Sequence, residues 1–205
     1  MKISLSQFMA YTAKTTTDAK IKEIRKIKND DYTFSGDYWM ALRTKFHKVL
    51  QGEMTFEQLE TFAKGVDEAK KKRKNYMAAT SKLKAFFSRK SFKYQPAPRA
   101  RWTSADKTLT ISCSPEFILE IDGLTYLIKV FYRLKKTDEK LTKRNIASTL
   151  HLMDTATYDY QPDNAIPAIL NLQTKQLVTL PDLKGGSIKT LEGDIAMFKA
   201  LWEIV

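Results

Sequence analysis

The first hundred residues repeat their apolar positions with the period of an α-helix. Spacings of three and four residues predict a helix over about residues 37–50 through Trp39, Leu42, Phe46, Val49 and Leu50. Shorter helices are predicted from Ser4 or Ser6 and after Thr17 as a cap. Another is predicted from Thr55, whose spacing to Gln58 suits a capping box, and its pattern continues to about Arg89 with a break near Gly65 or Asn75.

After residue 100 the apolar positions alternate or form short runs, as in strands. Leu109, Ile111 and Cys113 alternate with polar residues, and the apolar runs 117–121 and 124–132 are separated by Asp122-Gly123. Asp-Gly between two apolar runs is a strong signal for a two-residue hairpin turn. With that turn, Ile121 pairs with Leu124, and Glu116 lies opposite Lys129.

The rest of the chain predicts more helices and strands. A helix follows Thr142, strands cover about residues 168–172 and 176–180, and a last helix is capped by Thr190. Pro96 and Pro98 interrupt the chain between the two patterns. We therefore expect an α+β protein, with a basic helical region over residues 1–95 and an α/β region over residues 96–205 that forms a mixed or antiparallel sheet with flanking helices.

Charge strengthens this division. Residues 1–100 hold 22 basic and 10 acidic side chains, a net charge of +12, whereas residues 101–205 hold 13 of each. Between Lys64 and Lys93 there are 11 basic residues and only two acidic ones. A phosphate backbone attracts such a segment, and five aromatic residues, which single-strand binders use for stacking, are interleaved with the cations: Tyr76, Phe86, Phe87, Phe92 and Tyr94.

The sequence therefore predicts a nucleic-acid-binding protein with little base readout, because no zinc finger, basic zipper or RNP motif accompanies the charge. The predicted contact residues are Lys70, Lys71, Lys72, Arg73, Lys74, Lys82, Lys84, Arg89, Lys90 and Lys93. Two alternatives stay open at this point. The same surface would suit an adaptor or regulator that docks an acidic protein partner, and it would also suit a solvated helix whose lysines only keep the protein in solution.

A third reading concerns the predicted hairpin. The order hairpin, helix, strand, with acids before a strand lysine, resembles the PD-(D/E)XK nuclease core over residues 101–180. That resemblance implies a metal-dependent cleavage site with Glu116, Glu120 and Lys129 as candidate catalytic residues. The acid-x-Lys slot reads Leu127-Ile128-Lys129, so one carboxylate is missing, and Asp122 belongs to the turn. An ion pair between Glu116 and Lys129 is the simpler interpretation.

The chain also resembles uncharacterised bacterial proteins, and that resemblance implies no chemistry. The shared features are Trp102, Pro115-Glu116, Ile121-Asp122-Gly123, Tyr126 and Ile128-Lys129.

Several classes of function are excluded by composition. No run of 18 apolar residues exists and the N-terminus lacks an apolar signal segment, so we expect a cytoplasmic protein with no membrane partner. Cys113 is the single cysteine, and with only His47 and His151 beside it a Cys/His zinc site cannot form within the chain. We expect no cofactor and no bound metal, and Cys113 should be a small buried side chain. The oligomeric state is not determined by the sequence.

Overall fold

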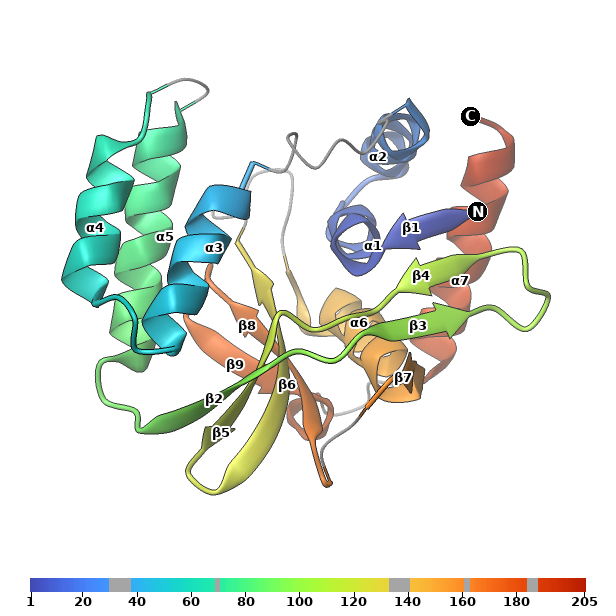
Figure 1. Cartoon of the computed structure of the whole chain (residues 1–205). Coiled ribbons are helices and arrows are strands. Elements are labelled where there is room, and N and C mark those ends of the chain that lie inside the picture. The colour runs from blue at the N-terminus through green and yellow to red at the C-terminus, as the bar shows by residue number, and fades with distance from the viewer. Residues whose placement is uncertain (30–37, 69–70, 133–140, 161–162, 184–187) are drawn as a thin grey trace.

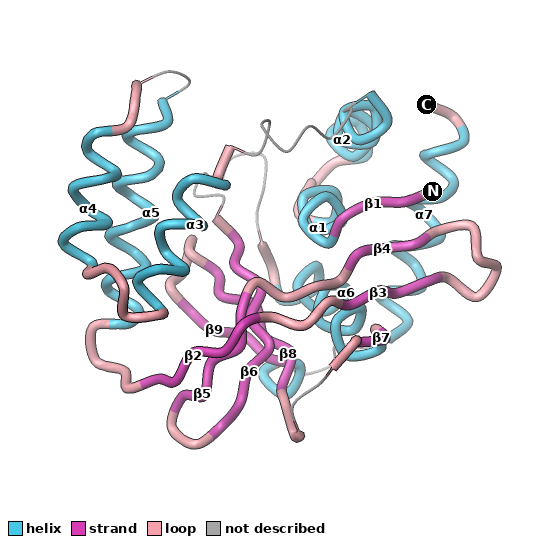
Figure 2. Tube along the Cα trace, viewed as in Figure 1, coloured by secondary structure: helices cyan, strands magenta, loops and turns pink. Residues whose placement is uncertain are grey.

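The computed structural model describes residues 1–29, 38–68, 71–132, 141–160, 163–183 and 188–205 (Figures 1 and 2). Within these ranges the helices are α1 (Leu5–Thr12), α2 (Thr17–Asn29), α3 (Met40–Leu50), α4 (Phe56–Gly65), α5 (Lys72–Phe87), α6 (Lys143–Thr155) and α7 (Ile188–Glu203). The strands are β1 (Lys2–Ser4), β2 (Phe92–Pro96), β3 (Ala100–Thr103), β4 (Thr110–Ser112), β5 (Phe117–Ile121), β6 (Leu124–Phe131), β7 (Thr157–Tyr158), β8 (Ile166–Asn171) and β9 (Gln176–Thr179). The fold is α+β, as predicted.

The larger sheet has the strand order β2-β5-β6-β8-β9. Its centre is the predicted hairpin in the predicted register, with Ile121 opposite Leu124 and Phe117 opposite Ile128. Asp122 and Gly123 form the turn with φ angles of 52° and 78°, the left-handed conformation that an Asp-Gly turn supplies. Helix α6 then connects β6 to the parallel strand β8, so the hairpin, helix and strand follow in the expected order.

Helices cover both faces of the larger sheet, which explains why its central strands are nearly continuous apolar runs. Phe117, Leu119 and Ile128 point into a core shared with α3, α4 and α5. Their neighbours Ile118 and Leu127 point into a second core shared with α1, α2, α6 and α7. Figure 1 shows the two helical layers, α3 to α5 on the left and the remaining helices on the right.

The smaller sheet has the order β1-β4-β3-β7 and contributes to the second core. Strand β1 pairs in parallel with β4, and β3 pairs antiparallel with β4 and β7. Ile3, Ile111 and Ala100 on one face of this sheet are buried. None of the short strands β1, β3 and β7 was predicted from the sequence, because two to four residues show no clear period.

Local capping chemistry sets several helix starts. Ser4, Thr55 and Thr142 each form a capping box at the start of α1, α4 and α6, respectively. Two predicted caps are wrong. The side chain of Thr16, and not of Thr17, accepts a hydrogen bond from the α2 residue Ala19, and Thr190 lies inside α7, which begins at Ile188.

Both cores combine residues from each side of the predicted boundary at residue 95. Leu5, Phe8 and Ile24 pack with the C-terminal helices α6 and α7, while α3 to α5 pack on the sheet formed mainly by later strands. The proline segment connects β2 of one sheet to β3 of the other. The boundary in charge and periodicity therefore does not separate two hydrophobic cores.

Candidate nucleic-acid interface and the buried Glu116–Lys129 pair

The predicted basic segment divides between the two ends of α5. Four consecutive cations, Lys71 to Lys74, lie at its N-terminus, where Lys71 has a left-handed φ of 60° and provides no side-chain cap. The first turn contains no acidic residue. A helix N-terminus carries partial positive charge, so cations there are disfavoured and anions are attracted. This end of α5 combines backbone and side-chain positive charge in one place.

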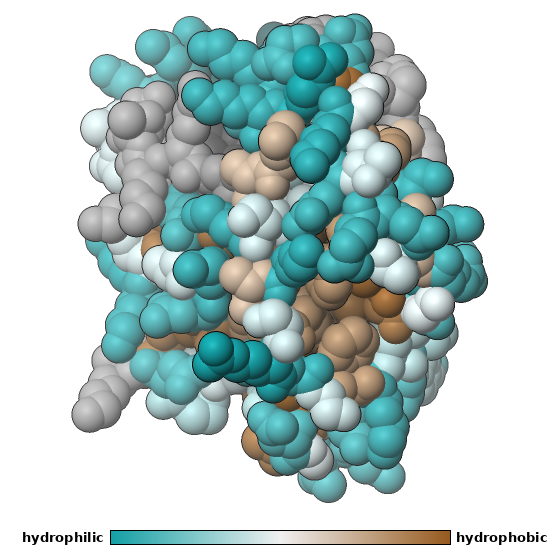
Figure 3. Space-filling model, turned by 90° about the vertical axis from the view of Figure 1, so that its left-hand side faces the viewer, coloured by the Kyte–Doolittle hydropathy of each residue, from teal (hydrophilic) through white to brown (hydrophobic). Residues whose placement is uncertain are grey.

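The central turns of α5 carry no cation on their exposed side. That exposed side is formed by Met77, Ser81 and Ala85, whereas Lys82 and Lys84 lie on the half-buried flanks. Figure 3 shows the face of the molecule that carries α4 and α5, where hydrophilic side chains surround a more apolar area. The predicted contact residues therefore do not form a continuous basic stripe along this helix.

Several of the predicted contact residues form ion pairs with acidic side chains of the protein itself. Lys84 Nζ lies 3.1 Å from carboxylate oxygens of both Glu57 and Glu60. Lys93 Nζ lies 2.9 Å from Glu120 Oε1. These exposed pairs contribute little to stability, but they reduce the charge that a phosphate would meet.

Others are held by backbone oxygens or rings. The Arg73 Nε donates to the Val66 carbonyl at 2.9 Å, and Lys82 Nζ donates to the Gln173 carbonyl at 3.3 Å. Lys72 lies over the ring of Tyr76 and Lys90 lies over that of Phe86, at 5.4 and 5.1 Å from the ring centres. In the described part of the chain, Lys71, Lys74 and Arg89 are exposed and have neither an acidic partner nor a hydrogen bond from the side chain. Lys70 lies outside the described residues.

The interleaved aromatic residues belong to the core. Tyr76 is fully buried, and Phe87 is 4% exposed. Phe86, Phe92 and Tyr94 are partly buried against the same cluster. Their rings fill the space between the helices and the sheet, so α5 offers charge without a stacking platform.

The hairpin brings Glu116 and Lys129 together, as the predicted register requires. Lys129 Nζ lies 3.1 Å from Glu116 Oε1, and the two side chains are 8% and 6% exposed. The Tyr132 hydroxyl donates to the other carboxylate oxygen at 3.0 Å. Trp39 stacks between the rings of Tyr132 and Tyr76 and so holds the tyrosine in place. The interpretation as a cross-strand ion pair is confirmed in its geometry.

His47 lies beside this pair, on α3. Its Nδ1 is 3.5 Å from the Tyr94 hydroxyl, and its ring packs edge-on against Phe117. Burial lowers the pKa of His47 below its ordinary value, and the charge of Glu116 only partly offsets that effect. A neutral His47 is therefore favoured next to the ion pair.

The other carboxylates considered for a nuclease site lie away from the Glu116–Lys129 pair. Glu120 pairs with Lys93 on the surface, and Asp122 sits in the turn. Among the described residues no group of three or more His, Cys, Asp or Glu side chains could hold a metal ion. Glu116 and Lys129 form their ion pair with each other, apart from these two carboxylates.

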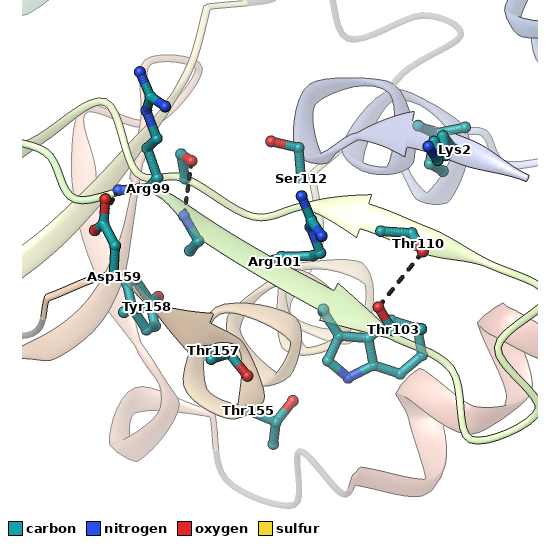
Figure 4. Close-up of a pocket in the computed structure, with 14 residues that line it drawn as sticks. Lys2, Arg99, Arg101, Thr103, Thr110, Ser112, Thr155, Thr157, Tyr158 and Asp159 are labelled. Carbon is teal, nitrogen blue, oxygen red and sulfur yellow. Dashed lines mark hydrogen bonds between the residues drawn. The ribbon is translucent and has the colours of Figure 1, made fainter.

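A groove on the outer face of the smaller sheet was not predicted (Figure 4). It has a volume of about 890 Å³ and is lined by three cations, Lys2, Arg99 and Arg101, together with hydroxyl side chains. The polar residues that alternate with Leu109, Ile111 and Cys113 were the available signal, since two of them, Thr110 and Ser112, line the groove. What the sequence lacked was the partner strands that place the cations beside these hydroxyls.

Within the described ranges, every helix is too short or too polar to cross a membrane. Comparison of the chain with protein-family models, with curated proteins and with solved structures gave no match.

Proposed function

We propose that this protein binds nucleic acid through phosphate contacts, with little base readout. The observation that carries the proposal is the N-terminus of α5, where the exposed Lys71 and Lys74 add side-chain charge to the positive end of the helix. Cations at this position oppose the helix dipole, and a bound anion would relieve that repulsion. The net charge of +12 adds a long-range attraction for a polyanion.

One observation favours a second candidate. The aromatic rings near α5 are partly or fully buried, so this surface has charge but no platform for bases. A surface that recognises charge alone also suits an acidic protein, and an adaptor or regulator with such a partner is the competing function. The cytoplasmic location and the bacterial origin suggested by the sequence stay predictions.

The test is charge reversal at the two exposed lysines of this end, Lys71→Glu with Lys74→Glu. Both side chains lack partners in the described part of the chain, so the exchange should leave the fold intact. A matched control, Lys22→Glu with Lys26→Glu, applies the same change in charge to exposed positions of α2. Fluorescence anisotropy with duplex DNA, single-stranded DNA and RNA over a salt series measures affinity and the number of phosphates contacted.

We expect the α5 variant to lose binding and the control to retain most of it. For duplex DNA the slope of log K against log salt should fall by about 1.8, since each phosphate contact contributes about 0.9. Equal losses in the two variants would mean that overall charge, and not α5, governs binding. If the wild-type protein bound none of the three nucleic acids near physiological salt, the proposal would be refuted and the acidic protein partner would take its place.

A further inference from the structure

The outer face of the smaller sheet is polar across all four of its strands. Ala100 and Trp102 of β3 pack against the core, so Arg101 and Thr103, which alternate with them, point outward. The pairing of β3 with β4 sets Arg101 opposite Ser112, which therefore shares the outer face. By the same alternation the other outward positions are Lys2, Ser4, Thr110 and Thr157. Each outward position of these strands is thus a cation or a hydroxyl side chain.

The aromatic residues of this sheet belong to its other face. Trp102 pairs with the buried Ile111, and Tyr158 pairs with the buried Ala100, so both rings pack against the core beneath the sheet. The Tyr158 hydroxyl also donates to the Met153 carbonyl of α6 at 2.6 Å. Within the described strands, the outward positions therefore hold no ring on which an unpaired base could stack.

The cations of the outer face have no acidic partner in the described chain. Lys2, Arg99 and Arg101 are exposed and line the groove on this face. Among its described lining residues the groove contains one carboxylate, Asp159, whose Oδ1 accepts hydrogen bonds from the backbone N–H groups of Arg99 and Tyr160 at 2.9 and 2.8 Å. The groove is left with an excess of positive charge that an external anion would neutralise.

These cations are spread over the sheet and do not meet at one point. Because β4 lies between β1 and β3, Lys2 and Arg101 start from strands about 9–10 Å apart, and Arg99 precedes Arg101 by two residues, about 6.6–6.8 Å along the strand. Figure 4 shows the three side chains apart from one another, with Ser112 next to Arg101. Separate cations with hydroxyl donors beside them suit several phosphates of one polymer better than a single anion.

We propose that this groove contacts the phosphate backbone of double-stranded nucleic acid, as a second contact surface that rests on the proposed function. Arginine, lysine, serine and threonine side chains are common partners of the phosphates of a duplex, and they bind it without reading its bases. A duplex carries one charge per about 1.7 Å of its axis, twice the density of each of its strands, so fixed cations attract it more strongly. Single-strand binders add stacking to charge, and the outward positions of this sheet supply only the charge.

The test compares the double variant Arg99→Gln with Arg101→Gln against the wild-type protein. Both side chains are exposed and form no ion pair in the described chain, so the exchange should preserve the fold, which circular dichroism checks. The matched control, Lys22→Gln with Lys26→Gln, removes the same charge from exposed positions of α2.

The probes are a labelled duplex DNA of twenty base pairs and one of its strands alone, each titrated by fluorescence anisotropy over a salt series. The α5 variant, Lys71→Glu with Lys74→Glu, is measured with the same probes, so that the two surfaces are separated. Inorganic phosphate at constant ionic strength serves as competitor. The rate of Lys2 acetylation with and without duplex, followed by mass spectrometry, reports on the groove itself.

We expect the groove variant to bind the duplex about 60-fold more weakly at 0.1 M salt, since two lost contacts of about 0.9 each remove about 1.8 from the slope of log K against log salt. The wild type should bind the duplex more tightly than the single strand. The control variant should change little, and bound duplex should slow the acetylation of Lys2.

Three results would overturn the inference. Unchanged duplex binding in the groove variant, together with loss in the α5 variant, would refute the groove and leave the proposed function standing. Tighter binding of the single strand than of the duplex, lost in the groove variant, would make a single strand the occupant. Complete displacement of the duplex by inorganic phosphate would indicate a site for a single anion. Absence of any nucleic-acid binding by the wild-type protein would instead refute the proposed function, and the inference with it.

Discussion

Lys129→Met should lower the free energy of unfolding by about 3–5 kcal/mol, the usual cost of removing one partner of a buried ion pair. The ammonium and carboxylate groups are 3.1 Å apart, and both side chains are more than nine-tenths buried. At an effective dielectric constant of about 20, that distance corresponds to an attraction of about 5 kcal/mol. The methionine has a similar volume, so the loss would come from the unpaired Glu116 carboxylate and not from a cavity.

A double-mutant cycle separates the charge from the packing. Glu116→Gln keeps an oxygen that can accept the Tyr132 hydroxyl, which now donates to Glu116 Oε2. Combined with Lys129→Met, it removes both charges, and the double variant should recover most of the lost stability because replacing a buried pair as a whole is often nearly neutral. Urea unfolding of the wild type, the two single variants and the double variant gives the coupling energy.

Three outcomes would contradict this reasoning. Additive losses in the cycle would mean that the pair contributes no coupling and that each side chain acts through packing alone. Loss of nucleic-acid binding in Glu116→Gln without loss of stability would make the pair part of a functional site. Magnesium-dependent cleavage by the wild type that Glu116→Gln abolishes would revive the nuclease reading.

Three further predictions concern other parts of the chain. Gly123→Ala should destabilise the protein by about 1–2 kcal/mol in chemical unfolding, because alanine would have to adopt a φ near 78°; no atom lies within 4 Å of the added Cβ, so the loss would come from backbone strain alone. The control Gly65→Ala in helix α4 should be neutral or stabilising. The hydrogen bond from the Lys199 ammonium is the largest of the effects that hold the pKa of Asp106 well below its usual range, so Lys199→Gln should raise the Asp106 pKa in an NMR titration. The stability gained from this contact is present above the ordinary aspartate pKa and is lost as the pH falls through the lowered pKa. Burial raises the pKa of the Cys113 thiol to about 12, and alkylation of Cys113 should therefore require unfolding; fast labelling of the folded protein would contradict its burial.

Only part of each candidate site could be predicted from local sequence patterns. The run Lys71 to Lys74 is contiguous in sequence, and its clustering at one place needed no tertiary information. The burial of Tyr76 and Phe87 did need it, because an aromatic residue between lysines has the same local pattern whether it packs inward or lies on the surface. The contact of Lys93 with Glu120 likewise depends on the pairing of β2 with β5.

The sequence by itself determined the elements that short-range chemistry controls. The Asp122-Gly123 turn determined the hairpin register and with it the Glu116–Lys129 pair, and the capping residues Thr55 and Thr142 determined two helix starts. Only the tertiary structure decided which distant strands pair. The parallel contact of β1 with β4 joins residues more than a hundred positions apart, and it brings Lys2 and Ile3 into a groove lined otherwise by residues between Arg99 and Asp159. Such pairings depend on the packing of whole layers, and a strand of three residues carries no periodic signal that could reveal them.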